Sequence, residues 1–256
     1  MRNCQAVAIG LAAVLFGSTG ATGPVPAAAR STPAAPHPST SGQAAATGTS
    51  TSKPPGSGAA ARPAPACAAF PGARQLGGGD GVSPAAWSGG GLVVPACGPV
   101  PGDSQHGPAV YPYPGALWTA GYQCVEFSER YLYDRYGVTM DVVTNGDQVA
   151  ANYATDFPGL FMIIRNGTPR RPPAAGDVLS LSAAPGFDSD TGGHTAVVQS
   201  SAVDAAGNGT VTVAEENADA AGIARLTVTG WTVRYPGYPY IEWLTATGEQ
   251  ARRPAR

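Results

Sequence analysis

The pattern of hydrophobic and polar positions predicts one long helix in the middle of the chain. Residues 124–136, CVEFSERYLYDRY, contain neither Gly nor Pro and place apolar side chains at helical spacing. Gly137 follows, and glycine tolerates the left-handed conformation in which many helices end. We predict a helix that starts at Gln123 or Cys124 and stops at Gly137.

After this helix the periodicity changes from helical to alternating, which predicts antiparallel strands. Residues 194–199 read HTAVVQ, residues 204–209 (DAAGNG) form a turn, and residues 210–217 (TVTVAEEN) return as a second strand, so the three segments predict a β-hairpin. Further strands are expected at residues 177–182, 225–233 and 238–244. A helix followed by several antiparallel strands indicates the α+β class.

The first residues have the pattern of a secretory signal peptide. Arg2 precedes an apolar run from Ala6 to Phe16, and small residues follow. The run is too short to cross about 30 Å of hydrocarbon as a helix. We expect residues 1–29 to be removed and the product to be secreted, extracellular or associated with a cell wall, without stable membrane insertion. The alternative is a buried helix of the mature fold.

Residues 30–66 consist almost entirely of Ala, Pro, Ser, Thr and Gly. Such a segment cannot bury enough apolar surface to offset its loss of backbone entropy, so we expect a disordered linker. The formal net charge of the whole chain is −2. No overall basic field exists to attract nucleic acid, and no nucleic-acid partner is expected.

Cysteine pairing is constrained by the oxidising exterior. Of the four cysteines, Cys4 lies in the leader, so Cys67, Cys97 and Cys124 remain and one of them is left over. Cys67 and Cys97 flank a Gly- and Pro-rich segment with little capacity for regular structure. A disulfide there would contribute about 3–4 kcal/mol on the chain-entropy model. We predict a Cys67–Cys97 disulfide within a loop-rich extension, residues 67–104, and a free Cys124.

The free Cys124 opens the predicted helix. A thiol in the first turn lies at the positive end of the helix dipole, which favours the nucleophilic thiolate. The unpaired N–H groups of the same turn could receive an oxyanion. The alternative interpretation is a buried cysteine that acts as a small hydrophobic residue.

A cysteine nucleophile needs a base, and His194 is the candidate. His37 falls in the linker and His106 in an irregular loop. In the predicted hairpin the start of the first strand, with His194, pairs with the end of the second, where Glu215 and Asn217 share a face. The alternative is an ordinary edge hairpin with exposed acids.

Four motifs then occur in a recognisable order: Gln123-Cys124, Pro173-Ala174-Ala175-Gly176-Asp177, Gly193-His194 and Glu215-Glu216-Asn217. This series resembles the CHAP family, the cysteine, histidine-dependent amidohydrolases/peptidases, over roughly residues 105–245. The resemblance implies a papain-like CHAP fold in which an N-terminal nucleophile helix packs against an antiparallel β-sheet. Residues 105–256 would form the catalytic domain.

The resemblance also implies a role for each motif residue. These roles are nucleophile for Cys124, general base and acid for His194, orientation of the imidazole for Glu215, polar support for Asn217, and a place beside the oxyanion pocket for Gln123. The family often has Gln where this chain has Glu216, so which of the two acids orients His194 stays open, although strand alternation favours Glu215. No metal or cofactor is expected, because the chain has no H-E-x-x-H motif and few histidines.

The leading functional hypothesis is a secreted, monomeric peptidoglycan hydrolase that acts through an acyl-enzyme. It would be an N-acetylmuramoyl-L-alanine amidase or an endopeptidase. A second hypothesis is an amidase of a small polyamine–peptide conjugate, because residues 122–127 are also similar to glutathionylspermidine amidases. The third is a non-catalytic cell-wall-binding module in which Cys124 is structural.

Overall fold

The structure of the chain is a computed structural model that describes residues 67–70, 72–77, 85–98, 108–140, 145–187, 192–218 and 221–248. All of these residues belong to one compact unit. The expected signal peptide and linker lie outside the described residues, and so do His37 and His106.

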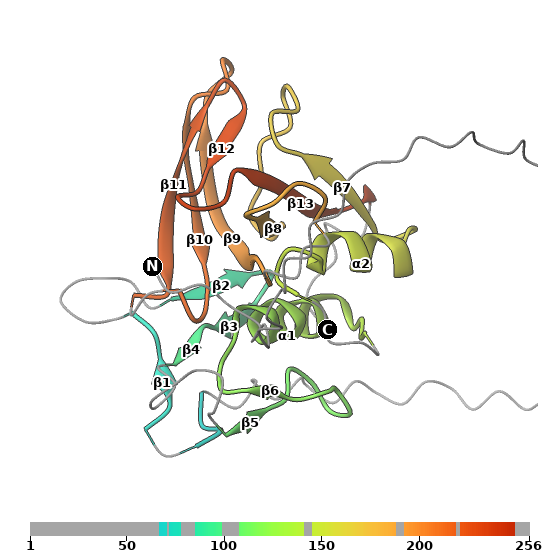
Figure 1. Cartoon of the computed structure of the whole chain (residues 1–256), viewed down its shortest axis with the longest axis vertical. Coiled ribbons are helices and arrows are strands. Elements are labelled where there is room, and N and C mark those ends of the chain that lie inside the picture. Colours follow the sequence, from blue (N-terminus) through green and yellow to red (C-terminus); the bar gives the residue numbers. More distant parts are fainter. Residues whose placement is uncertain are drawn as a thin grey trace, which may run out of the picture. The chain divides into compact units, whose positions relative to one another are not determined.

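Two helices occur in the described part of the chain (Figure 1). Helix α1 spans Cys124–Tyr136 and ends at Gly137, which has a φ of 71° and donates its N–H to the Tyr133 carbonyl at 2.8 Å. The predicted helix is therefore confirmed. Helix α2, Val149–Asp156, was not predicted from the sequence. Neither helix is long and apolar enough to cross a bilayer.

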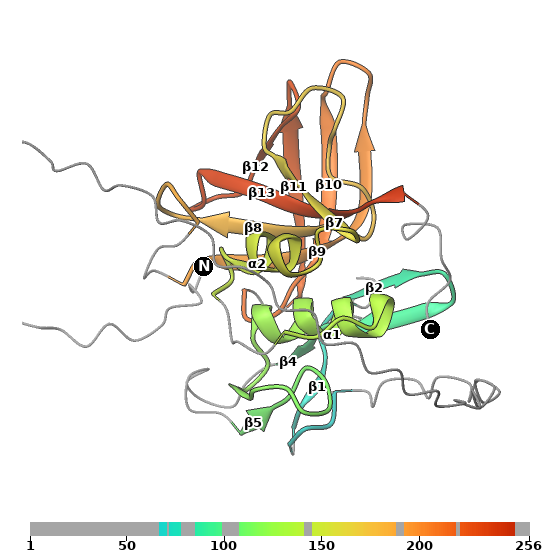
Figure 2. The same ribbon diagram turned by 90° about the vertical axis from the view of Figure 1, so that its right-hand side faces the viewer.

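A seven-stranded antiparallel sheet forms the centre of the described region. Its order is β12-β11-β10-β9-β8-β13-β7. The strands are β7 (Phe161–Arg165), β8 (Val178–Ser182), β9 (His194–Val203), β10 (Gly209–Ala214), β11 (Ile223–Thr229), β12 (Thr232–Arg234) and β13 (Tyr240–Ala246). Figure 2 shows that the sheet curls, so that β8 and β13 run across the direction of β10 and β11. The predicted hairpin is confirmed, although its second strand ends at Ala214 and not at Asn217. The strands expected at 177–182 and 238–244 are confirmed, whereas residues 225–233 form parts of two strands, β11 and β12, joined by a turn at Gly230 and Trp231. The class is mixed α/β with an antiparallel sheet.

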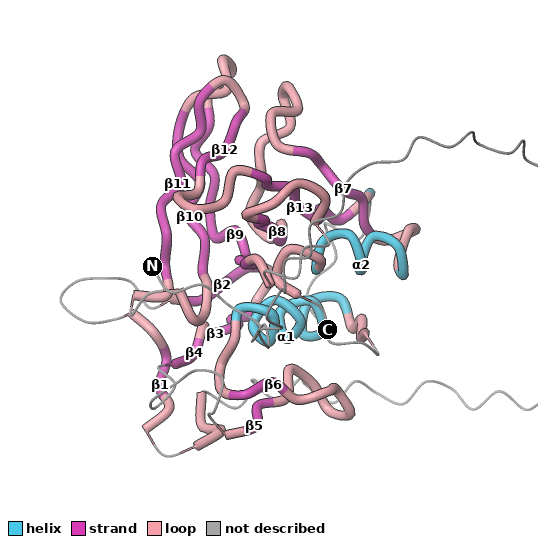
Figure 3. The backbone as a smooth tube through the Cα atoms, in the orientation of Figure 1, coloured by secondary structure: helices cyan, strands magenta, loops and turns pink. Residues whose placement is uncertain are grey.

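Strand alternation gives the sheet two apolar faces. Val197 of β9 and Val178 of β8 belong to a core that they share with α1 and α2. Figure 3 shows both helices, in cyan, next to these strands. Ala196 and Val198 point the other way, into a second core formed largely by the sheet strands themselves. Thr195 of β9 contacts Ser128 of α1, with 3.0 Å between the two hydroxyl oxygens, so α1 lies against the start of β9.

The extension before α1 is more regular than its composition indicated. It contains β1 (Arg74–Gln75), β2 (Ala86–Gly89), β3 (Leu92–Pro95) and β4 (Cys97–Gly98), where β2 pairs with β3 and β1 with β4. Strands of two to four residues therefore occur in and next to a segment whose composition predicted little regular structure. The physical reason is burial: Trp87 is 5 % exposed and packs on Tyr131 of α1, with 4.8 Å between ring centroids. Contact with α1 therefore supports strands that the local composition does not favour.

The predicted Cys67–Cys97 disulfide is confirmed, and Cys124 is not part of a disulfide. A short ladder of β5 (Ala109–Val110) and β6 (Thr119–Ala120) follows the extension and leads into α1. The disulfide lies in a third, smaller apolar cluster with Phe70, Val110 and Tyr122.

Candidate active site

Cys124 is the first residue of α1, as the sequence predicted. Gln123 caps the helix with an extended backbone, and its side chain makes no capping bond to the helix N–H groups. The first turn therefore presents backbone N–H groups and the positive end of the dipole beside the sulfur. The Cys124 side chain is buried, with 1 % of the residue exposed.

His194 opens β9 and pairs with Glu215, just beyond the end of β10. The imidazole Nε2 lies 3.0 Å from the Glu215 carboxylate Oε2, and both residues are almost completely buried. A buried carboxylate at one ring nitrogen fixes the orientation of the ring and favours the tautomer that carries its proton at Nε2. The pair therefore has the geometry of a histidine base with its orienting acid.

The glycine before His194 is required by close packing. Gly193 has a φ of 54°, and a Cβ at this position would lie 2.5 Å from the Asp147 Cβ. At Gly146 a Cβ would approach the His194 backbone to 2.7 Å. The loop before α2 thus lies directly against the start of β9, and any side chain at either glycine would displace His194.

The start of α1 is tied to the same end of the sheet. Asn217 donates from Nδ2 to Oε1 of Gln123 at 2.7 Å, and Gln123 Nε2 donates to the Ala120 carbonyl at 2.8 Å. Asn217 is two residues from Glu215, a chain length of at most about 7 Å. Gln123 is bonded to Cys124. Short paths therefore connect the cysteine to the residue that contacts His194.

The other acid of the motif, Glu216, faces away from His194. Its Oε1 accepts from Arg130 Nη2 at 2.9 Å and from the Cys97 N–H at 2.6 Å. Burial, and then the neighbouring Glu126 carboxylate, raise the pKa of Glu216 well above its ordinary value, while Arg130 lowers it. The structure thus places Glu215 against the histidine and Glu216 against the helix and the extension.

The Pro173-to-Asp177 motif contributes a turn under α1. The Asp177 Oδ2 accepts from the Ala174 N–H at 2.8 Å, and the Tyr131 hydroxyl donates to the Gly176 carbonyl at 2.8 Å. Gly176 has a φ of 93°, and a Cβ there would lie 2.9 Å from the Tyr131 hydroxyl. Burial raises the pKa of Asp177 to about 6. The motif therefore positions β8 against the helix.

Two tyrosines at the site were missed by sequence reasoning. The Tyr235 hydroxyl lies 3.1 and 3.0 Å from the two Glu215 carboxylate oxygens and donates to that group. The Tyr238 ring stacks on the imidazole of His194, with 6.0 Å between centroids and 22° between planes. Both lie in the turn between β12 and β13, and the one available signal was the aromatic-rich YPGYPY string at 235–240.

Within the described ranges, no group of three or more His, Cys, Asp or Glu side chains could hold a metal ion. What the arrangement offers is a thiol at a helix start and a histidine–glutamate–tyrosine chain at the end of a sheet. These groups suit nucleophilic and acid–base chemistry.

Comparison with known families identifies the class. Residues 113–217 match the family model of the CHAP domain, so the resemblance found in the sequence is confirmed over this region. The family implies amidohydrolase or peptidase activity in general, and CHAP domains act on peptidoglycan. The match includes every predicted site residue, whereas the extension and β11–β13 lie outside it. A search of curated proteins finds no match to the chain.

Proposed function

We propose that this chain is a secreted cysteine hydrolase that cleaves an amide bond of peptidoglycan. Cys124 is the nucleophile, His194 the general base and acid, and Glu215 the group that orients the imidazole. Asn217 and Gln123 support the site, and the Gln123 amide lies beside the oxyanion pocket.

The observation that carries this proposal is the buried His194–Glu215 pair, tied to the start of α1. The pair is held at 3.0 Å, and the Asn217–Gln123 hydrogen bond of 2.7 Å connects the same strand end to the residue before Cys124. A second contact joins α1 to β9, because the hydroxyl oxygens of Ser128 and Thr195 are 3.0 Å apart. Ser128 is one helical turn after Cys124, about 6 Å along the axis. Thr195 is adjacent to His194, so this contact places the start of β9, which carries the histidine, beside the first turns of α1.

The chemistry follows from these positions. With Nε2 directed at Glu215, Nδ1 is the ring nitrogen that takes the thiol proton. The thiolate attacks the amide carbonyl, and N–H groups of the first helical turn receive the oxyanion. His194 then protonates the departing amine, and a water molecule that it activates hydrolyses the acyl-enzyme.

Secretion is supported by the leader pattern of residues 1–29 and by the Cys67–Cys97 disulfide. Disulfides persist in oxidising compartments and are rare in the cytosol. This combination favours a cell-wall substrate over an intracellular polyamine conjugate. The bond that is cut is either the sugar–peptide amide or a peptide bond of the stem or cross-bridge.

The test is release of new primary amines from purified peptidoglycan by the full chain, with mass analysis of the fragments. We expect Cys124→Ala to abolish release and to leave the thermal midpoint nearly unchanged, because one small buried group is replaced by another. Thr155→Ala, on the exposed side of α2, is the matched control and should behave as wild type.

Release by the wild type that persists in Cys124→Ala would reject the assignment of the nucleophile. No release by the wild type from peptidoglycan, with hydrolysis of a polyamine–peptide conjugate, would reject the substrate instead. Binding to the wall without any hydrolysis would favour the non-catalytic module.

A further inference from the structure

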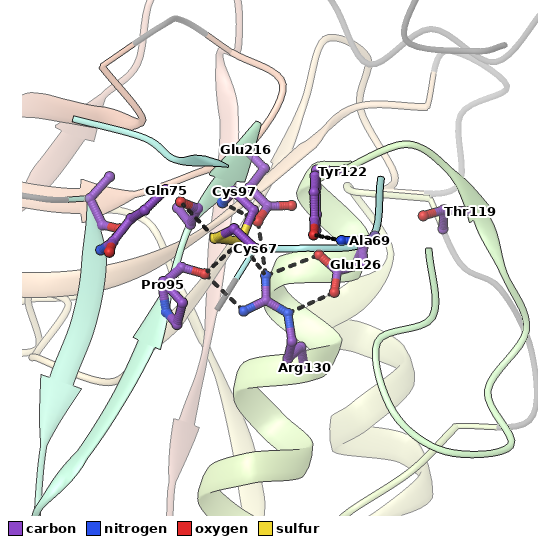
Figure 4. A network of polar contacts seen from close by, with 12 residues as sticks. Cys67, Ala69, Gln75, Pro95, Cys97, Thr119, Tyr122, Glu126, Arg130 and Glu216 are labelled. Atoms are coloured by element: carbon purple, nitrogen blue, oxygen red, sulfur yellow. Dashed lines mark hydrogen bonds and ion pairs between the residues drawn. A yellow bond between two sulfur atoms is a disulfide. The ribbon is translucent and has the colours of Figure 1, made fainter. Parts of the chain in front are cut away.

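The disulfide-bonded extension contacts three parts of the chain: Tyr122 before α1, Arg130 of α1, and Glu216 after β10 (Figure 4). The extension, here residues 67–98, lies outside the matched CHAP region. The segment that follows Cys67 contacts Tyr122, near Cys124, and Cys97 itself contacts Glu216, next to Glu215.

The segment after Cys67 contacts the approach to the nucleophile. The Ala69 N–H donates to the Tyr122 hydroxyl at 3.1 Å, and the Phe70 and Tyr122 rings are 5.5 Å apart at their centroids. Tyr122 is two residues before Cys124 and 5 % exposed. A movement of this segment would therefore be felt at the start of α1.

The segment around Cys97 contacts the strand end that carries the acid. The Cys97 N–H donates to Glu216 Oε1 at 2.6 Å, in the middle of the Glu215-Glu216-Asn217 motif. Glu216 is bonded directly to Glu215, so fixing the Glu216 side chain on the extension restrains the backbone from which Glu215 reaches His194.

Arg130 connects α1 to Glu216 and to the extension. From α1 it donates through Nε to Glu126 Oε1 at 2.7 Å and through Nη2 to Glu216 Oε1 at 2.9 Å. Its third contact is to the extension, where Nη1 donates to the Pro95 carbonyl at 2.8 Å. Glu126 and Glu216 are almost completely buried, and a buried guanidinium with several fixed partners has one well-defined geometry.

We propose that the described parts of the extension, residues 67–70, 72–77 and 85–98, are a positioning element of the active site, held in place by the Cys67–Cys97 disulfide and fixed to the neighbours of the catalytic residues through Glu216 and Arg130. This inference rests on the function proposed above. We infer that the extension sets the position of the segment around Cys124 relative to the segment around Glu215, in addition to stabilising the fold.

Two variants test it in the full chain. Cys67→Ser/Cys97→Ser opens the disulfide, and Glu216→Ala removes the acceptor of the Cys97 N–H and one partner of Arg130. We expect each variant, assayed at a temperature below its own melting temperature, to have a kcat on peptidoglycan at least tenfold lower than that of wild type. The pH-dependent rate of Cys124 alkylation by iodoacetamide, located by mass spectrometry, should fall in parallel. Glu216→Gln keeps the acceptor oxygen and should recover both rates to within about threefold of wild type.

The matched control is Val228→Ala, which creates a cavity in the second core, away from the extension. It lowers stability and should leave kcat and the alkylation rate unchanged. Unchanged rates in the disulfide and Glu216→Ala variants would overturn the proposal, and so would an equal loss in Val228→Ala. If Glu216→Ala does not fold, the disulfide variant and Glu216→Gln decide. The alkylation rate needs no substrate, so it judges this inference even if peptidoglycan proves to be the wrong substrate.

Discussion

Glu215 and Glu216 are consecutive residues, yet they belong to two different regions of the molecule. Glu215 lies among a histidine and a tyrosine that come from β9 and from the turn after β12. Glu216 lies between α1 and the disulfide-bonded extension, with Arg130 and the Cys97 N–H as partners. Both follow the end of β10 at Ala214, and their side chains leave the chain toward opposite neighbours.

The two regions use the same side chain for different physical purposes. At Glu215 the negative charge faces a titratable imidazole, where it can support a positive charge that forms and disappears during catalysis. At Glu216 the carboxylate faces a permanently charged guanidinium, which cannot exchange a proton. The first environment is suited to chemistry, and the second to holding segments together.

The comparison is tested directly by exchanging each acid for its amide. The largest effect on activity is expected at Glu215. Glu215→Gln keeps the shape but removes the charge that supports the imidazolium and permits the wrong tautomer. We expect kcat to fall by about 10²- to 10⁴-fold. The matched variant is Glu216→Gln, which should stay within about threefold of wild type. Steady-state kinetics on peptidoglycan at fixed pH measures both.

The outcome that would break the comparison is a reversal. If Glu216→Gln lost more activity than Glu215→Gln, Glu216 would be the orienting acid and the buried pair with His194 would be structural. Equal losses would mean that the two regions are not functionally separate.

An intermediate effect is expected from the hydroxyl of Tyr235. Tyr235→Phe removes a hydrogen bond to the Glu215 carboxylate but keeps the ring that lies 5.5 Å from Tyr238. Hydrogen bonds to charged groups contribute about 1.5–3 kcal/mol, so we expect kcat to fall by roughly 10- to 100-fold. KM should change little, because Tyr235 acts through Glu215. Tyr240→Phe, at an exposed position in the same segment, is the control.

A rise in KM with kcat unchanged would show that Tyr235 contacts substrate and does not position Glu215. Wild-type kinetics in Tyr235→Phe would show that the carboxylate holds His194 without this donor.

The helix and the hairpin could be predicted because their signals are local. The run from Cys124 to Gly137 contains its own periodicity and its own stop. In the hairpin, the predicted alternation puts Glu215 and not Glu216 toward His194, and Glu215 is the acid that contacts the imidazole, although β10 itself ends at Ala214. The glycine turns and the odd cysteine likewise carry their meaning within a few residues or in a simple count. All of these elements are found in the structure.

The remainder depends on contacts between distant residues. Cys97 and Glu216 are 119 positions apart, and nothing in either segment indicates the other. Strands β2 and β3 acquire regular structure because Trp87 is buried against α1, which composition cannot reveal. Tyr235 lies 20 positions from Glu215, beyond the hairpin that periodicity predicts.

The smallest effect on activity, and the clearest effect on stability, is expected at a third buried carboxyl, that of Glu129 in α1. Glu129 is 4 % exposed, and its Oε1 has no hydrogen-bond partner among the described residues. Unlike Glu216, it has no guanidinium among the influences on its ionisation. Burial, with a smaller contribution from Glu126, raises the pKa of Glu129 to about 8.

This shift has a definite sign. Between the ordinary pKa of 4.5 and about 8, the folded protein retains a proton that the unfolded chain releases. The free energy of unfolding contributed by Glu129 should therefore fall with rising pH, by at most about 1.4 kcal/mol per pH unit, and level off above pH 8. Glu129→Gln removes the proton exchange, so its advantage over wild type should grow from pH 5 to pH 8. Urea unfolding across this range measures the difference. Parallel curves for the two proteins would mean that Glu129 is ionised in the fold and that a cation or solvent compensates it.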